Sequence, residues 1–415
     1  MLVLLYPTID PNPAIKPPQR IKERIKERTV DFELSEELSI LEQTARDFAL
    51  KELAPGAIER DATREYPLDI MKKLAPLGFL GIMVPEEYGG AGMSALAYSI
   101  IMEEIARWDA SVALNMAAQN SLCLGHLMVA ANEEQKQKYV APLASGQKLG
   151  AWGLTEPGSG SDAAGMRTHA KMDGDEWVLN GSKMFITQGA VADIIVIMAV
   201  TGEGDRKRPI SAFILETGRN GTATPGFSAR KILNKLGMHA SDTAELVLED
   251  VRVPRDCLLG KEGEGFTDTL KVLTSGRIGI GAISVGIARG ALEDSVQYAK
   301  QREQFGKPIA QFQQIQWMLA DMAVQIDAAR LLVRRAAAMK DAGATVTREA
   351  AEAKLFASET ATRASLNAIQ ILGGYGYTSE FHVERYLRDA KLLEIGEGTS
   401  QIQRIVIAKH LMREF

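Results

Sequence analysis

The sequence has few of the residues that build metal and redox sites. Only two cysteines occur among its 415 residues, Cys123 and Cys257, and they lie far apart. The five histidines are scattered along the chain. Neither residue type shows the spacing of a metal-ligating or redox motif. We therefore expect no metal site, and thiols that are buried or incidental in a reducing compartment.

Other absences narrow the class of protein. The 48 basic and 53 acidic residues leave a net charge of -5, which gives no electrostatic footprint for nucleic acid. No stretch approaches eighteen consecutive apolar residues. The apolar start, Met1 to Tyr6, is too short for a signal-peptide core, and we assign no chemistry to the basic run from Arg20 to Arg28. We expect a soluble, cytoplasmic protein without a membrane span.

The content of the chain is that of a large globular protein. Apolar residues make up 46% and charged residues 24%, and the length suggests two or three domains. The pattern is helical at first, with Ser35 as N-cap and Leu38, Leu41, Ala45 and Phe48 on one helix face. Further helices are expected from Pro67 to Gly78, from Ala95 to Arg107, over residues 111–131 as one helix or a pair, and from Glu133 to Tyr139.

The middle of the chain has the period of β-strands. Residues 175–179 and 183–187 flank Asn180-Gly181, which predicts a hairpin turn there. Residues 193–201, 210–215 and 244–253 are further strand candidates. After Gly265, long Ala-rich segments at 266–302, 310–341 and 346–372 are typical of a helical bundle.

These patterns predict an α+β protein with helical, β and helical parts. The predicted order is an N-terminal extension at 1–30, an N-terminal α-helical domain at 31–150, a middle β-barrel or sandwich domain at 151–265, and a C-terminal four-helix bundle at 266–415.

One carboxylate stands out in the last part. Glu397 lies between Gly396 and Gly398, after an apolar run and before a Thr-Ser-Gln cluster. Flanking glycines let the backbone turn sharply, and burial beside apolar groups raises the pKa of a carboxyl group, as a general base at neutral pH requires. A surface turn is the alternative interpretation, and the stretch alone does not decide between them.

Three other motifs are ambiguous when taken singly. Residues 155–162, TEPGSGSD, form either a plain turn or a loop of backbone donors for a phosphate or a flavin edge. The dinucleotide fingerprint fails at Ala163, and no Walker A motif occurs. Arg277 is an isolated charge in an apolar helix, so it needs an ion-pair partner or a ligand. Residues 302–308, REQFGKP, read as a charged helix end.

In combination these motifs resemble the acyl-CoA dehydrogenase family, and within it the short-chain (butyryl-CoA) enzymes. The similarity runs from about Phe32 to the C-terminus. It rests on six blocks: LTEPGSGSDAAG at 154–165, FITQG at 185–189, SGRIGIGA at 275–282, QREQFGKPIAQFQ at 301–313, QILGGYGY at 370–377 and EGTSQIQR at 397–404.

The resemblance implies an FAD-dependent oxidoreductase of lipid metabolism, with a place in fatty acid β-oxidation. In the family, a base removes the α-proton of an acyl-CoA thioester while the β-hydrogen leaves as hydride to flavin N5, which gives the trans-2-enoyl-CoA. Glu397 matches the base of most branches, and the position used by other branches is Gly276 here. In the glutaryl-CoA enzymes of the family, an arginine for the distal carboxylate lies in the region that corresponds to residues 111–119, which hold no basic side chain here. The resemblance therefore implies an uncharged acyl group, of short to medium length.

The resemblance also assigns binding residues. Those that match FAD contacts are Trp152, Leu154, Thr155, Gly160, Ser161, Phe185, Ile186, Thr187, Arg302, Phe305, Gln313, Gln370, Gly373, Gly374, Thr399 and Gln401. Those that match contacts to the acyl-CoA are Ser161, Thr274, Arg277 and Gly398. The group from Arg302 to Gly374 matches residues that reach the FAD of a neighbouring subunit, which implies a homotetramer built as a dimer of dimers. Electrons are expected to pass to an electron-transfer flavoprotein.

Rival interpretations remain open on the sequence alone. One is an oxygen-using flavin oxidase or monooxygenase of the same fold, which would consume oxygen during turnover. Another is a non-catalytic relative that binds nucleic acid or protein, and a purely structural helical protein is a third. The charge balance and the presence of Glu397 argue against the binding relative.

Overall fold

A computed structural model describes residues 33–202, 208–219, 221 and 223–414. The predictions for Met1 to Tyr6 and for Arg20 to Arg28 lie outside the described residues. By its internal contacts the chain divides into a unit Met1–Ser39 and a unit Ile40–Phe415, and the site discussed below belongs to the second.

The N-terminal part is helical, as predicted. Helix α2 begins where Ser35 predicts, and the Leu38 N–H donates to Ser35 Oγ at 3.3 Å. The helices of this part are α2 Glu36–Phe48, α3 Ala57–Thr63, α4 Leu68–Leu74, α5 Ala95–Trp108, α6 Ala110–Ala117, α7 Gly125–Ala130, α8 Glu133–Gln135 and α9 Ala141–Ala144. Helix α5 is buried on nearly all sides, because it packs against the long helix α10, Gly265–Gln301.

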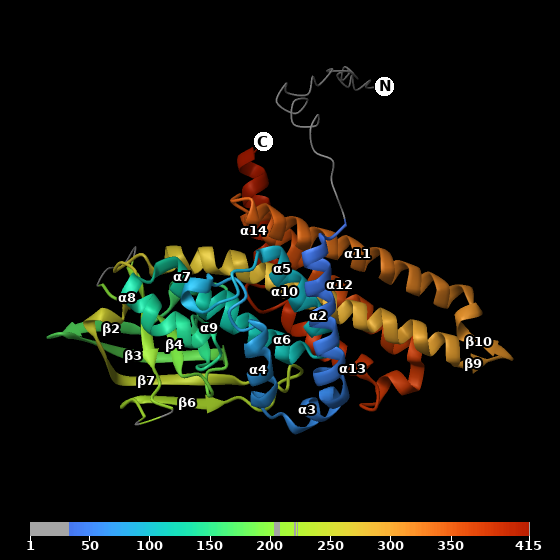
Figure 1. Cartoon of the computed structure of the whole chain (residues 1–415), viewed down its shortest axis with the longest axis horizontal. Coiled ribbons are helices and arrows are strands. Elements are labelled where there is room, and N and C mark those ends of the chain that lie inside the picture. Colours follow the sequence, from blue (N-terminus) through green and yellow to red (C-terminus); the bar gives the residue numbers. More distant parts are fainter. Residues whose placement is uncertain (1–32, 203–207, 220, 222, 415) are drawn as a thin grey trace, which may run out of the picture. The chain divides into compact units, whose positions relative to one another are not determined.

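The β region forms one connected sheet in the described part of the chain (Figure 1). Its strands are β1 Gly150–Gly153, β2 His169–Asp173, β3 Glu176–Thr187, β4 Ile194–Val200, β5 Ile210–Glu216, β6 Phe227–Lys231, β7 Thr243–Pro254 and β8 Leu258–Leu259. The order is β6-β7-β3-β2-β4-β5-β8, with β1 parallel to β4 at a fork.

Strand β4 explains why the sheet folds over on itself. Every residue of β4 is buried, so both of its faces are covered. Ile194, Val196 and Met198 pack with the helices around Leu124 and Tyr139. The alternate residues of β4, from Ile195 to Ala199, pack instead against β3 and β7 in a second core, which gives the β region the character of a sandwich.

The hairpin predicted at Asn180-Gly181 is wrong. Strand β3 runs straight through this dipeptide, with a register shift against β7 between Leu179 and Gly181. The hairpin turn lies earlier, between β2 and β3, where Gly174 has φ +63°. Gly181 lies in a β-bulge instead. Glycine is required there because a Cβ would come within 2.5 Å of Thr168 Oγ1. The other strand candidates are confirmed.

The C-terminal part is the predicted helical bundle. It contains α10 with α11 Gln313–Asp341, α12 Thr347–Leu372, α13 His382–Leu393 and α14 Ser400–Glu414. A short ribbon, β9 Glu303–Gln304 and β10 Lys307–Pro308, lies between α10 and α11. In Figure 1 this ribbon and the β sheet lie at opposite ends of the second unit. The order of helical region, β region and bundle is confirmed, while the predicted domain boundaries stay predictions.

Helix α10 is the core helix of the bundle. By length and composition alone it could cross a membrane, with a mean hydropathy of 1.3 over its most apolar window. However, 72% of that window is buried against other parts of the chain. Helix α12 covers one side of α10 and α5 covers another, which is the environment of a core helix in a soluble protein.

Candidate active site

Glu397 lies in the loop between α13 and α14, with its backbone in a conformation that few side chains adopt. Its φ is +53°, and the next residue, Gly398, has φ +94°. A non-glycine residue in the left-handed region is uncommon, and it persists where the surroundings hold it in place. The surrounding structure thus holds this loop in a conformation that directs the Glu397 carboxylate toward the protein interior.

Helix α10 leaves a gap for this carboxylate. A Cβ added at Gly276 would lie 1.9 Å from Glu397 Oε2 and 2.8 Å from its Cδ. Any side chain at position 276 would therefore displace the carboxylate. Oε2 itself is buried and accepts no hydrogen bond within the described residues. An unpaired buried acceptor of this kind is costly, and it is free to take a proton from a ligand.

Burial sets the proton affinity of Glu397. It raises the pKa of this carboxyl group to about 7, and the positive charges of Lys354 and Arg277 oppose the rise. The Glu397 carboxyl therefore exchanges between its acid and base forms near neutral pH, as a general base must. Tyr98 from α5 is also close, because its buried hydroxyl interacts electrostatically with Glu397.

Two buried side chains hold the Glu397 loop from the protein interior. Lys354 on α12 donates from Nζ to the Gly398 carbonyl at 2.8 Å. Gln403 on α14 donates from Nε2 to the same carbonyl at 2.8 Å and to the Glu397 carbonyl at 3.2 Å. Both side chains are fully buried. The backbone carbonyls are thus fixed, while the Glu397 N–H donates no hydrogen bond among the described residues.

Arg277 follows Gly276 on α10 and is only 6% exposed. Its guanidinium makes neither a salt bridge nor a hydrogen bond with any described residue, and Nε is completely buried. Burial lowers the pKa of Arg277, and the negative charge of Glu397 opposes this. Of the two interpretations left open by the sequence, the absence of an ion-pair partner in the described part of the chain favours a ligand.

The TEPGSGSD loop is held rigid by a buried ion pair. Lys183 on β3 donates to Glu156 Oε1 at 2.8 Å and to the Leu154 carbonyl at 3.2 Å. Glu156 also accepts from the N–H groups of Arg167 and Thr168. Burial lowers the pKa of Lys183 to about 8, and its attraction to Glu156 opposes this. The inner side of the loop is therefore fixed by its own contacts.

The outer side of the same loop is open. A Cβ at Gly160 would meet nothing within 4 Å, and Ser161 is exposed. Phe185 on the adjoining β3 is 65% exposed, although its φ of +60° is unusual for an aromatic residue. Ile186 is buried behind it and Thr187 is half-buried. An exposed aromatic ring beside a fixed loop with free space fits a flat cofactor such as the isoalloxazine of FAD.

Trp152 lies in β1 and is buried, with its indole fixed in place. Its Nε1–H donates to His126 Nδ1 at 2.9 Å. Burial lowers the pKa of His126 to about 4, so that the ring is neutral and can accept this bond. Leu154 is buried in the same core. Thr155 is half-buried, and its carbonyl accepts from the Met184 N–H at 2.8 Å.

The remaining predicted FAD residues lie in two other places. Thr399 is half-buried and Gln401 is exposed, both beside the Glu397 loop. The others share the end of the bundle near β9 and β10, are all exposed, and comprise Arg302, Phe305, Gln313, Gln370, Gly373 and Gly374. Phe305 is 94% exposed. Thr274, predicted to contact the substrate, is half-buried and bonds the Leu270 carbonyl.

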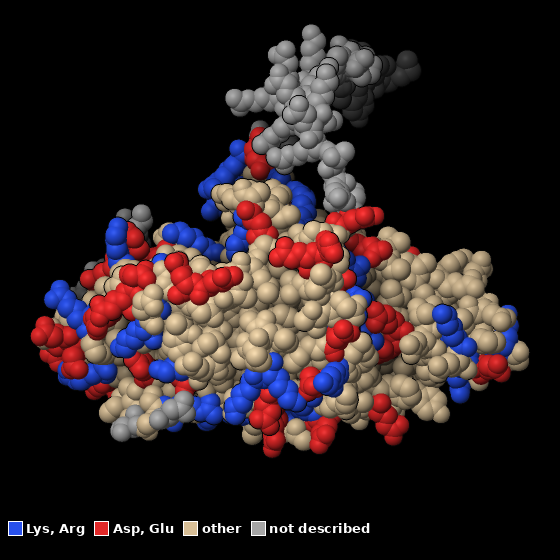
Figure 2. Space-filling model, viewed as in Figure 1, with Lys and Arg blue, Asp and Glu red and all other residues tan. Residues whose placement is uncertain are grey.

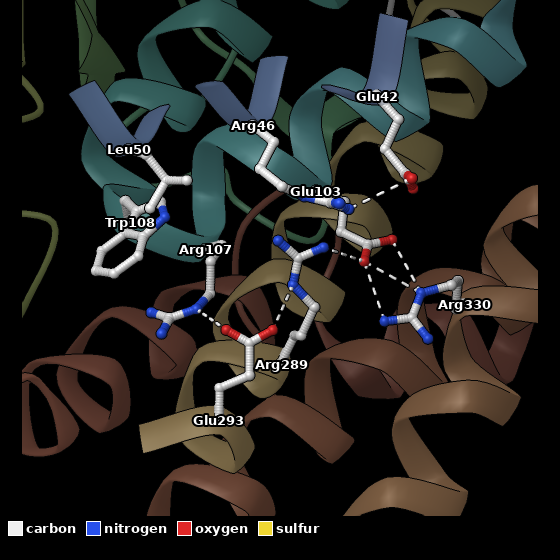
Figure 3. Close-up of a pocket in the computed structure, with 9 residues that line it drawn as sticks. All are labelled: Glu42, Arg46, Leu50, Glu103, Arg107, Trp108, Arg289, Glu293 and Arg330. Atoms are coloured by element: carbon white, nitrogen blue, oxygen red, sulfur yellow. Dashed lines mark hydrogen bonds and ion pairs between the residues drawn. The ribbon is translucent and has the colours of Figure 1, made fainter. Parts of the chain in front are cut away.

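The described residues also form a cavity of about 600 Å³ away from Glu397. It is lined by Glu42, Arg46, Leu50, Glu103, Arg107, Trp108, Arg289, Glu293 and Arg330. Figure 3 shows that its arginines and carboxylates face one another in an ion-pair network. Arg289 lies three turns beyond Arg277 on α10, roughly 18 Å along the helix. The charges that line the cavity are paired with one another, so we assign this cavity no reaction.

Comparison with known proteins identifies the family. Three family models match: the acyl-CoA dehydrogenase N-terminal domain at residues 35–147, the middle domain at 151–251 and the C-terminal domain at 263–412. The chain belongs to the acyl-CoA dehydrogenase family. It is therefore an FAD-dependent oxidoreductase that acts on acyl-CoA thioesters, as the resemblance in the sequence predicted.

Similar proteins cover nearly the whole chain. A probable acyl-CoA dehydrogenase of Bacillus subtilis, YngJ, is 50% identical over 92% of this chain and 100% of its own length. The solved butyryl-CoA dehydrogenase of Megasphaera elsdenii is 45% identical, with a TM-score of 0.89, over 92% of this chain and 100% of that one.

A third similar protein is a solved structure described as the electron transferring flavoprotein of Acidaminococcus fermentans, from work on flavin-based electron bifurcation. It has a TM-score of 0.90 and is 47% identical over 92% of this chain and 100% of that one. Together these similarities do not favour the oxygen-using alternative.

Sequence reasoning missed the residues that support the site. Lys354, Gln403, Lys183 and His126 were not singled out, although each is fully buried. Lys354 had a signal, since it is a single charge in the apolar run Ala353 to Ala357 of a predicted helix. Lys183 and His126 had none, because their partners Glu156 and Trp152 lie 27 and 26 residues away. Gln403 lies only five and six residues after its partners, but nothing in the local sequence marks its side chain as buried.

Proposed function

We propose that this acyl-CoA dehydrogenase acts on short, uncharged acyl-CoA thioesters, with Glu397 as the base that removes the α-proton. The observation that carries the proposal is the unpaired, buried Oε2 of Glu397, for which Gly276 leaves space. Its carboxyl group titrates near neutral pH, so the carboxylate form is available under ordinary conditions. The absence of a basic residue at 111–119 supports an uncharged acyl chain.

The surroundings of Glu397 provide the other requirements of α-proton abstraction. The α-proton of a thioester is a weak acid, so the carbonyl oxygen needs hydrogen-bond donors as negative charge develops. The Glu397 N–H is a candidate donor, since no described residue accepts from it. Arg277, buried and without an ion-pair partner among the described residues, fits the thioester or pantetheine group, with Gly398 beside the reacting carbonyl.

FAD, when bound, supplies the acceptor for the hydride that leaves the β-carbon. Trp152, Leu154 and Thr155 would hold it from β1 and the following loop. Gly160 and Ser161 would hold its pyrophosphate side, and Phe185, Ile186 and Thr187 would pack on the ring. The open, rigid face formed by these residues supports this assignment. By holding the acceptor in place, these residues would let a substrate bound at Arg277 lie between Glu397 and the acceptor, and such orientation supplies much of the rate.

We infer that the enzyme is a homotetramer whose cofactor site is completed by a second subunit. The six exposed residues of this set lie at the bundle end near β9 and β10, which is opposite the β sheet in Figure 1. They are Arg302, Phe305, Gln313, Gln370, Gly373 and Gly374. One chain therefore presents two separate sets of FAD-matching residues. We further propose a cytoplasmic location, because Cys123 and Cys257 are both free, and an electron-transfer flavoprotein as the electron acceptor.

The decisive test is anaerobic mixing of the purified enzyme with butyryl-CoA and longer acyl-CoAs while flavin absorbance is followed. We expect chain-length-dependent bleaching in the wild type and a loss of several powers of ten in its rate in Glu397→Gln. An unchanged rate in Glu397→Gln would remove this residue as the base. Bleaching by no acyl-CoA would overturn the substrate assignment, and oxygen consumption in turnover would replace the proposed electron acceptor.

A further inference from the structure

Lys354 is a buried ammonium group that its hydrogen bonds do not explain. The residue is 0% exposed, in an Ala-rich stretch of α12. Its three N–H protons have one hydrogen-bond acceptor among the described residues, the Gly398 carbonyl at 2.8 Å, and no salt bridge to a described carboxylate. A buried charge with so few partners is costly, which indicates that the charge itself has a function close to the Gly398 carbonyl.

That contact lies next to the base. The Gly398 carbonyl directly follows Glu397 in the chain, and Gln403 already donates to it. A neutral donor therefore suffices for the hydrogen bond, and the charge of Lys354 needs its own reason. The carboxylate of Glu397 lies within electrostatic range and carries the opposite charge.

We propose that Lys354 is a positioning residue whose charge, held on the Gly398 carbonyl, keeps the buried Glu397 carboxylate ionised for proton abstraction. The inference rests on the proposed role of Glu397 as the base. Lys354 acts through Glu397 from the protein interior.

The other charges around Glu397 point to Lys354 as the main partner. Arg277 faces Glu397 from α10, and the buried hydroxyl of Tyr98 faces it from α5. Of the two positive charges, Lys354 has the larger effect on Glu397. Glu394 and Glu359 face Lys354 and help it to stay protonated, while Arg277 opposes this.

The titration order is consistent with this role. Burial lowers the pKa of Lys354 to about 8, and Glu397 titrates at about 7. Lys354 is thus still charged over the range in which Glu397 loses its proton. Because removing a nearby positive charge disfavours the carboxylate, Glu397 should then stay protonated to higher pH.

The test compares Lys354→Gln, which keeps a donor for Gly398 but removes the charge, with Lys354→Met, which removes both. The rate of flavin bleaching by butyryl-CoA is measured in the FAD-loaded enzyme from about pH 6 to about pH 9. Infrared difference spectra against Glu397→Gln report the protonated carboxyl directly. Lys235→Met is the control, since burial also lowers the pKa of Lys235 to about 8 but Glu397 is not among its partners.

We expect both Lys354 variants to shift the acidic limb of the bleaching rate upward by about one to two pH units, with recovery at high pH. The carboxyl signal of Glu397 should persist to correspondingly higher pH, and Lys235→Met should match the wild type. An unshifted limb, or an equal loss of rate at every pH, would overturn the proposal; if Lys354→Met fails to fold, Lys354→Gln decides. Loss of activity in Glu397→Gln with unshifted Lys354 variants would refute only this inference.

Discussion

At the scale of single residues, the site depends on an absent side chain as much as on the carboxylate. Gly276 is needed because Glu397 Oε2 occupies the place of its Cβ. Gly396, in contrast, leaves room, since a Cβ there would make only an ordinary contact at 3.6 Å with the Leu392 carbonyl. The glycine that makes room for the carboxylate is thus on helix α10, while of the two sequence neighbours only Gly398, with φ +94°, has a conformation that requires glycine.

Gly276→Ala should therefore slow the enzyme strongly without unfolding it. The added methyl group would force the Glu397 carboxylate to move, and a displacement of about 1 Å in a reacting group costs on the order of a hundredfold in rate. Flavin bleaching by butyryl-CoA measures this effect, and FAD content and circular dichroism report the fold. Gly125→Ala on α7 is a matched control, because its Cβ would lie 3.7 Å from the Asn120 carbonyl. Equal activity of both variants would contradict the geometry.

The sequence revealed the residues that carry unusual local patterns and missed those that act across the fold. Glu397 and Arg277 stood out because of glycine neighbours and an isolated charge. Lys183 did not, since its partner Glu156 is 27 residues away and the two meet only when β3 crosses the loop. Local spacing contains no information about such pairs, because burial decides their importance.

At the scale of elements, the Asn-Gly error shows how tertiary contacts override turn chemistry. Asn180-Gly181 favours a tight turn, yet Asn180 Oδ1 accepts from the Asp250 N–H at 2.9 Å on β7. Gly181 instead lets β3 pass close to Thr168. The pairing of a long strand with β7 outweighs the preference of two residues. The helices were predicted more reliably because their apolar stripes extend over many turns.

The ion-pair network in Figure 3 joins α5, α10 and α11, and at its centre the Glu103 side chain is 6% exposed and that of Arg289 15%. Arg289 bonds Glu104 at 2.6 Å and Glu103 at 3.1 Å, and Glu104 is 1% exposed. Arg289→Met would leave these carboxylates partly uncompensated, and breaking a buried pair from one side costs about 3–5 kcal/mol. Chemical denaturation followed by circular dichroism should show a lower midpoint.

The control for this prediction is Arg252→Met. Arg252 on β7 also bonds two carboxylates, but these belong to Asp173 and Glu176 of the exposed β2–β3 hairpin. Solvent screens exposed pairs, so the midpoint should hardly change. Equal effects of the two substitutions would mean that burial of the network does not govern its contribution.

At the scale of the whole molecule, the order of helical, β and helical regions followed from periodicity, whereas the assembly does not. The reason is that an interface between copies resembles ordinary surface until the fold shows which apolar residues stay exposed. Trp317, Val324 and Leu331 lie seven residues apart on α11, which places them on one face, and they are 57%, 69% and 50% exposed. Figure 2 shows few charged side chains over the end of α11 that approaches β10.

This exposed stripe predicts where the proposed tetramer is held together. Val324→Glu would place a charge within a dry interface, where an unpaired carboxylate is strongly disfavoured. We expect a smaller species in analytical ultracentrifugation. The same variant should retain less FAD, because Arg302 and its neighbours at the bundle end would no longer reach a second subunit.

Val129→Glu supplies the comparison for this prediction, because Val129 on α7 is 44% exposed and belongs to no proposed site. A wild-type mass for Val324→Glu would show that α11 does not form the interface. A smaller species with undiminished FAD would support the α11 interface but contradict a shared cofactor site, since the site would then be complete within one chain. Only a joint loss of mass and FAD would show that assembly completes the cofactor site. That result would explain why Phe305, Gly373 and Gly374 stay exposed at the bundle end, since they would contact the FAD of a second subunit.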